Sequence, residues 1–149
     1  MKPSLLSSLL LAALVCAGAS PPARAAADVS AVQATGAPGA YTFAVTVRSP
    51  DKGCNQYADW WEVLSADGRL LYRRVLLHSH VDEQPFSRSG GPVAIKAGDT
   101  VYVRAHMSTT GYGGAVFKGS PAGGFARDPA PPSLPDHSRT PPLPDVCAF

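Results

Sequence analysis

Two histidines separated by one residue, His78 and His80, are the residues of this chain whose type and spacing most directly suggest chemistry. On an extended backbone, side chains two positions apart point to the same side, so both imidazoles could reach one metal ion. Asp82 and Glu83 follow closely and could add an oxygen ligand. The simpler interpretation is that both rings bind loop backbone near residues 84–86, and we prefer it because this spacing alone is a weak signal.

A third imidazole, His106, lies in a segment that alternates like a strand over 100–107. Its apolar face is expected to hold Val101, Val103, Ala105 and Met107, which places Tyr102, Arg104 and His106 on the other face. If that strand end meets the His78 loop, three imidazoles could bind Zn(II) or Cu(II). A Cu(I) site built from methionines is excluded, because Met107 is the only thioether left after signal cleavage.

The aromatic run over 57–63 suggests a second kind of site. Trp60 and the later Tyr112 could stack on sugar rings if they were exposed. Alternation puts Trp61 and Trp60 on opposite faces of a strand, which predicts that one is buried and the other faces outward or lies under the tail. The competing interpretation is that arginine stems or a loop cover the outward ring.

The acidic residues give no enzymatic signature. Nothing in the sequence fixes two of them at the separation that acid and base catalysis of glycoside hydrolysis needs, and no serine sits on a strand-to-helix elbow. Ion pairs with nearby arginines are the expected use, and we predict that the protein is not an enzyme. The carboxylates are Asp59, Glu62, Asp82 and Glu83, and the arginines are Arg73, Arg74, Arg88 and Arg104.

The elements that must position these residues are strands and turns. Period-2 alternation is clearest over 41–48, and Gly68 in the turn 65–68 can take a positive φ. Two hairpins are expected, one turning at 36–39 and one at 65–68, and a third unit is expected to turn at 96–99. The expected strands are 29–35, 41–48, 56–64, 69–77, 93–95 and 100–107.

This spacing of short strands predicts an all-β domain, an antiparallel β-sandwich over 26–118. The segment 95–103 resembles the turn before the penultimate strand of immunoglobulin and fibronectin type III domains. That resemblance implies a sandwich of this kind and nothing about function. A small open barrel is the alternative architecture.

The amino terminus predicts export. Lys2, an apolar run over 5–17 and the small-residue motif 23–25 read as a signal peptide over 1–25, with a second cleavage position after Ala27. The run is too short to span a bilayer as a helix, so a periplasmic or secreted protein is expected. A lipoprotein is the alternative because Cys16 ends the run, although Val15 stands where a small residue is usual.

The net charge limits the classes of binding partner that we expect. The whole chain carries 13 basic and 11 acidic residues, and cleavage after Ala25 removes Lys2 and Arg24, which leaves the mature domain neutral. Without a basic run longer than two residues, nucleic acid and anionic membranes are not expected partners. An unknown protein or small ligand remains.

The cysteines and prolines describe the end of the chain. Cleavage leaves Cys54 and Cys147, and an even pair in an oxidising compartment predicts one disulfide. The tail over 119–149 is rich in glycine and proline, which excludes helix. We expect a strap returning to Cys54, with a proline-rich ligand for a partner domain as the alternative. Together these patterns predict an exported binding or interaction module, with a metal site or a sugar site as the alternatives.

Overall fold

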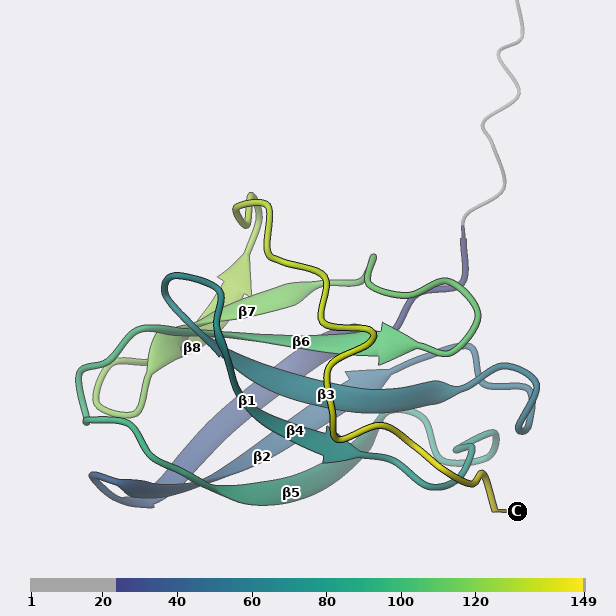
Figure 1. The fold of residues 1–149 in the computed structure, drawn as a ribbon, viewed down its shortest axis with the longest axis horizontal. Helices are drawn as coiled ribbons and strands as arrows, with labels where there is room; N and C mark the ends of the chain where they lie inside the picture. The colour runs from purple at the N-terminus through teal and green to yellow at the C-terminus, as the bar shows by residue number, and fades with distance from the viewer. Residues whose placement is uncertain (1–23, 149) are drawn as a thin grey trace, which may run out of the picture.

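The computed structural model describes residues 24–148, which form eight β-strands and no helix. The strands make two antiparallel sheets, an arrangement consistent with the predicted β-sandwich (Figure 1). Most of the predicted signal peptide, including Cys16, lies outside the described residues. Within 24–148 there is no helix of the length and apolar character that crossing a membrane requires.

The smaller sheet has three strands in the order β1-β2-β5. β1 (Asp28–Ala37) and β2 (Ala40–Arg48) form the first predicted hairpin. β5 (Phe86–Val93) pairs with the other side of β2 and is an edge strand. The predicted alternation is confirmed on β2, where the apolar side chains are buried, namely Tyr41, Phe43, Val45 and Val47.

The larger sheet has five strands in the order β4-β3-β6-β7-β8. β3 (Ala58–Ser65) and β4 (Leu70–Val75) form the second predicted hairpin, and Gly68 in its turn has φ 84°. β6 (Val101–Met107) pairs with the other side of β3. β7 (Val116–Ser120) and β8 (Gly124–Asp128) complete the sheet, and β4 is the edge strand on the opposite side.

The core lies between the sheets. Trp61 and Val63 of β3 and Val103 of β6 are fully buried in one cluster with Phe43 of β2. The opposite face of β3 and β6 is buried as well, although it carries the polar side chains of Glu62 and other residues. A sheet face that holds charged groups and yet excludes water must be covered by another part of the chain.

That cover is the tail (residues 129–148), which contains no strand. In Figure 1 the tail runs as the yellow segment across the outer side of β6, β3 and β4. It ends beside Cys54, to which Cys147 is joined by a disulfide with an S–S distance of 2.10 Å. The backbone N–H of Ala148 donates to the carbonyl of Leu77 at 2.6 Å, so the last described residues pair with the loop after β4.

Four elements differ from the sequence prediction. β5 occupies a stretch that was expected to be loop, and β7 and β8 extend the sheet to Asp128, beyond the expected domain end at 118. The expected strand over 93–95 is absent, since β5 ends at Val93. Glycine and proline hide such strands from a pattern search, but Pro92 near the end of an edge strand needs no ladder hydrogen bond.

Candidate functional site

The structure places the three candidate histidines in two separate regions. His78 and His80 lie in the loop between β4 and β5, whereas His106 lies on β6 and faces the tail. Among residues 24–148, no three His, Cys, Asp or Glu side chains are grouped so that they could hold a metal ion. The predicted metal cluster of His78, His80, His106, Asp82 and Glu83 is therefore not assembled. The histidines have different neighbours, because His106 pairs with Asp59 beside β6 and His80 stacks on Phe86 of β5.

His106 is engaged by its neighbours on the outer face of the larger sheet. Its Nδ1 lies 2.7 Å from Oδ1 of Asp59, and its ring stacks on Trp60 at a centroid distance of 3.7 Å. Tyr112 meets the ring edge to face at 4.8 Å. With these contacts and an exposed fraction of 7%, His106 is a structural residue of this face.

Glu62 is the centre of the same region. Its side chain is fully buried, and Oε2 accepts hydrogen bonds from Arg73 Nη2 at 2.6 Å and Nε at 3.0 Å. Oε1 accepts one from Arg104 Nε at 2.8 Å. Glu62 and the five side chains packed around it form what we call the outer-face cluster, namely Trp60, Glu62, Arg73, Arg104, His106 and Tyr112.

The tail completes the hydrogen bonding of this cluster. The remaining donors of Arg73 reach the carbonyls of His137 at 2.7 Å and Pro142 at 3.1 Å. Arg104 Nη2 donates to the carbonyl of Pro135 at 2.6 Å. Because a buried guanidinium is costly unless its donors are paired, these carbonyls both satisfy the arginines and hold the tail in place.

The two rings considered for sugar stacking belong to this cluster. Trp60 is only 3% exposed, with His106 stacked on its ring and the guanidinium carbon of Arg73 lying 4.3 Å from its centroid. Tyr112 has the guanidinium of Arg104 over its ring at 3.6 Å. Burial raises the pKa of Tyr112 to about 12, and the charge of Glu62 adds to the shift. Trp60 is therefore buried beneath these neighbours, whereas Tyr112 is half-buried beside Arg104.

The second region is a pocket at the edge of the sandwich, where edge strands β4 and β5 run along the same side. It has a volume of about 170 Å³ and receives residues from β4, from the loop after it and from β5. We call it the His80 pocket, and it is lined by Arg74, Val75, Leu76, Leu77, His78, His80 and Arg88.

His80 is held firmly, but its ring nitrogens are not paired. Its backbone N–H donates to Oδ2 of Asp51 at 2.8 Å, its carbonyl accepts from Gln84, and its ring stacks on Phe86 at 3.7 Å. The side chain is 1% exposed, yet neither Nδ1 nor Nε2 has a hydrogen-bond partner among the described residues. The nearest carboxylate oxygen, Oδ2 of Asp51, is 3.9 Å from Nδ1. An unpaired buried polar group of this kind costs about 1–3 kcal/mol.

The charges around His80 favour its neutral form. Burial is the largest cause of a lowered pKa, about 4, and the positive charges of Arg88 and His78 add to the effect. Arg88 itself is paired with the exposed Glu83 through two hydrogen bonds of 3.1 and 2.8 Å. Arg74 is exposed and makes no ion pair or side-chain hydrogen bond with residues 24–148. The pocket therefore contains a neutral buried imidazole beside a free guanidinium.

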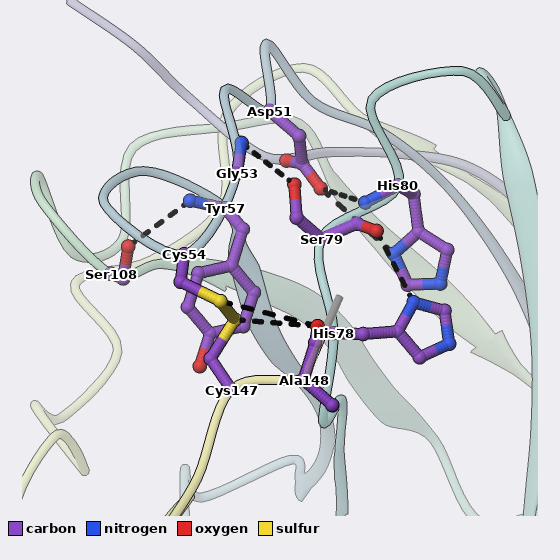
Figure 2. The surroundings of a disulfide bond; sticks show 10 residues. All are labelled: Asp51, Gly53, Cys54, Tyr57, His78, Ser79, His80, Ser108, Cys147 and Ala148. Atoms are coloured by element: carbon purple, nitrogen blue, oxygen red, sulfur yellow. Dashed lines mark hydrogen bonds and ion pairs between the residues drawn. A yellow bond between two sulfur atoms is a disulfide. The ribbon is translucent and has the colours of Figure 1, made fainter.

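His78 and His80 do lie side by side, with ring centroids 4.4 Å apart, and Figure 2 shows both imidazoles on the same side of the loop. Within the described residues no third His, Cys, Asp or Glu side chain is grouped with them, and Glu83 pairs with Arg88. His78 is exposed, with Nδ1 3.2 Å from the carbonyl of Ser79. The spacing thus places two imidazoles together, as the alternation argument required, without completing a metal site.

The disulfide braces the back of this loop (Figure 2). Next to Cys54, the N–H of Gly53 donates to Oγ of Ser79 at 3.1 Å. Next to Cys147, Ala148 pairs with the backbone at Leu77 and His78. The cross-link therefore fixes the backbone from which both imidazoles project.

Sequence reasoning did not identify Asp51, Phe86 or Arg74 as parts of a site. The short distance along the chain between His80 and Arg88 was the available signal, since the loop that contains His80 leads directly into β5, which contains Arg88. The contribution of β4 to the pocket, through Arg74 and Val75, could not be predicted from closeness along the chain. It depends on two edge strands of different sheets lying together, which is a tertiary relationship.

Comparison with known proteins gives one informative relative. No family model matches this sequence, and no solved structure matches it. A protein of Halomicrobium mukohataei named "Putative lipoprotein" is 44% identical over 79 residues, which is 52% of this chain. The aligned part is 38% of that relative, so the chain spans well under half of its length.

Proposed function

We propose that this protein is an exported β-sandwich module that binds a ligand in the His80 pocket. The observation that carries the proposal is a fully buried imidazole with two unpaired nitrogens in a pocket that also contains an unpaired arginine. Buried polar groups in folded proteins are nearly always paired, so exceptions call for an explanation. A bound ligand that accepts a hydrogen bond supplies one.

Export is supported by two observations. The relative is named "Putative lipoprotein", and the Cys54–Cys147 disulfide suits an oxidising compartment. We propose a periplasmic or secreted protein that is cleaved after Ala25 and is not anchored through Cys16. The earlier cleavage position is favoured because Ala27 is 1% exposed in the core cluster, and cleavage after Ala27 would remove it.

We further propose that the sandwich is of the immunoglobulin or fibronectin type III kind. The supporting observation is strand order, with the first, second and fifth strands in one sheet and the third, sixth and seventh in the other. Immunoglobulin domains distribute their A, B, E and C, F, G strands in this way. β4 beside β3 then corresponds to the additional strand of variable-type domains, and β8 is an extension.

Binding is favoured over catalysis because the pocket lacks a catalytic pair. The ring of His80 has no hydrogen-bonded nucleophile or acid among the described residues. The hydroxyl of the adjacent Ser79 is occupied by the N–H of Gly53. Nucleophilic catalysis needs a nucleophile and a base within hydrogen-bond reach of each other, and this pocket offers the base alone.

The surroundings of the pocket also suit binding. Of the large apolar side chains in 24–148, those most exposed include Leu77 at 48%, Val81 at 50% and Val146 at 61%. Leu77 lines the pocket, Val81 follows His80, and Val146 precedes the disulfide that braces the loop. Exposed apolar groups around a polar pocket are typical of ligand and partner surfaces.

The test is a ligand screen of the oxidised mature protein, read through the histidine side-chain resonances in NMR spectra. We expect compounds that bind to shift the signals of His80, while those of His106 in the outer-face cluster stay in place. The variant His80→Phe, which keeps a ring for Phe86 to stack on, should no longer bind these compounds. Because this variant has no His80 signal, binding is read in it and in the wild type through the resonances of His78, which lines the same pocket. A screen in which no anion, cation or neutral fragment moves His80 would contradict the proposed function.

A further inference from the structure

The His80 pocket contains an unbalanced positive charge. Arg74 and Arg88 both line it, and only Arg88 is neutralised, by Glu83. Oδ2 of Asp51 lies 3.9 Å from Nδ1 of His80, but this carboxylate is buried and already accepts from Ser49 Oγ at 2.6 Å, from the N–H of Ala58 and from the N–H of His80. The guanidinium of Arg74 therefore has no counter-charge in the pocket.

The pocket is also richer in donors than in acceptors. A neutral imidazole carries one N–H and one acceptor nitrogen, so His80 offers one buried donor and one buried acceptor without partners, and the donors of Arg74 give the pocket its excess. The guanidinium of Arg74 adds donors in a planar fork, which matches the geometry of carboxylate and phosphate oxygens. A metal cation would meet only the two imidazoles of His78 and His80, and two arginines would repel it.

The volume limits the size of the group that can enter. Pockets for drug-sized ligands are about 300–1,000 Å³, whereas this one is about 170 Å³. It suits a small ion or the terminal group of a longer molecule, whose remainder would extend toward the exposed Leu77.

We propose that the His80 pocket binds a small oxyanionic group, a carboxylate or a phosphate, through the ring N–H of His80 and the guanidinium of Arg74. One oxygen of the anion accepts a hydrogen bond from the buried N–H of His80, and its other oxygens accept from Arg74. Binding thus gives charge-assisted hydrogen bonds to a donor and a guanidinium that are otherwise unpaired. Arg88 keeps its ion pair with Glu83 and contributes to anion binding only through its positive electrostatic potential. This inference rests on the proposed function, since it names the class of ligand for the same pocket.

The experiment is titration of the oxidised mature protein at pH 7 with inorganic phosphate and, separately, with acetate. Sodium chloride at matched ionic strength serves as the control for screening of surface charge. We expect at least one oxyanion to shift the His80 resonances with a saturable curve and a dissociation constant below about 1 mM, which corresponds to about 4 kcal/mol. Comparison of the two arms distinguishes a phosphate site from a carboxylate site.

Variants separate the pocket from adventitious binding. His80→Phe and Arg74→Gln should each weaken binding of the effective anion at least tenfold. Arg127→Gln removes an exposed arginine of β8, outside the pocket, and should leave binding unchanged. If Arg127→Gln weakens binding as much as Arg74→Gln does, the anion recognises surface charge and the inference is wrong.

The remaining outcomes distinguish this inference from the proposed function. If phosphate and acetate leave His80 unmoved while Zn(II) or a neutral fragment shifts it, the pocket is a binding site of another chemistry and only the oxyanion inference fails. If no probe moves His80, the proposed function fails with it. Circular dichroism of each variant verifies that the loss of binding is not a loss of fold.

Discussion

Arg73 and Arg74 are neighbours on β4, and they belong to the two polar regions of this molecule. Arg73 is buried in the outer-face cluster, where Glu62 and three carbonyls of the tail pair its donors. Arg74 lines the His80 pocket and has no partner among residues 24–148. Since the side chains of successive strand residues point to opposite sides, Arg73 and Arg74 lie in different environments although they are adjacent in sequence. Arg73 has a structural role, and Arg74 is available for binding.

The histidines repeat the contrast. His106 and His80 are both buried, and each stacks on an aromatic ring at 3.7 Å. His106 also has the carboxylate of Asp59 at 2.7 Å, whereas His80 has no partner for either nitrogen within the described residues. Burial and aromatic stacking therefore do not separate the two sites. The two sites differ in hydrogen bonding, because the ring of His106 is paired and the ring of His80 is not. The unpaired ring is the one that can accept a ligand as its partner.

The strongest test of the comparison removes the tether of the tail. The double variant Cys54→Ser, Cys147→Ser opens a loop with a sequence separation of 93, which should lower the free energy of unfolding by about 4–5 kcal/mol in the chain-entropy model. Urea unfolding followed by circular dichroism measures the change. Acrylamide quenching adds a local readout, since Trp60 lies under the tail and Trp61 lies in the core. Quenching that is unchanged would show that the tail holds its place without the disulfide.

The next test breaks the outer-face cluster from its centre. Glu62→Gln leaves Arg73 and Arg104 buried without a counter-charge, and we expect a loss of about 3–5 kcal/mol of unfolding free energy. The matched control is Glu83→Gln, which breaks the exposed pair with Arg88 and should cost no more than about 1 kcal/mol. Both values come from chemical denaturation. Equal losses in the two variants would contradict the structural role assigned to the cluster.

The sequence predicted much of this contrast, because alternation along a strand is a local property. It placed His106 and Arg104 on the face opposite Val103, and it separated Trp60 from Trp61. It also anticipated that the acidic residues would pair with arginines, as Glu62 and Glu83 do. A period of two residues decides such questions without knowledge of the whole fold.

What the sequence could not predict depends on contacts between distant elements. Whether His78 and His106 meet is decided by the face of β6 on which His106 lies and by the path of the loop after β4, since β4 and β6 belong to the same sheet. The carbonyls that satisfy Arg73 come from a proline-rich segment whose path depends on Cys147. β7 and β8 escaped notice because Gly119 and Gly124 read as loop, although the sheet tolerates them at its far edge.

A pH titration of stability separates the two buried histidines by their response to acid. The pKa of His80 is lowered to about 4 in the folded protein, whereas the usual pKa of a histidine in an unfolded chain is near 6.5. Between these two pH values the unfolded chain binds a proton at His80 and the folded protein does not. Stability is therefore complete above pH 6.5, falls as the pH drops toward 4, and has lost about 3 kcal/mol below that point.

The measurement compares wild type with His80→Phe in chloride buffer between pH 7 and 4. Subtracting the variant removes the titration of carboxylates that both proteins share. Burial opposes protonation most, Arg88 and His78 also oppose it, and Asp51 and Glu83 favour it. The free Arg74 also lines the pocket. A difference between the two proteins that stays constant over this range would show that His80 is not held in its neutral form.

The smallest expected change returns to the neighbouring arginines. Arg74→Gln removes a side chain without a partner in 24–148 and should alter unfolding free energy by no more than about 0.5 kcal/mol, as exposed substitutions usually do. Arg73→Gln removes the pair with Glu62 and the bonds to the tail, and should cost about 3 kcal/mol. The effect on binding of the effective oxyanion should be the opposite of the effect on stability. Arg74→Gln should lose binding, and Arg73→Gln should retain it under conditions in which that variant is folded. A variant that loses both properties, or neither, would mean that the two faces of β4 are not independent.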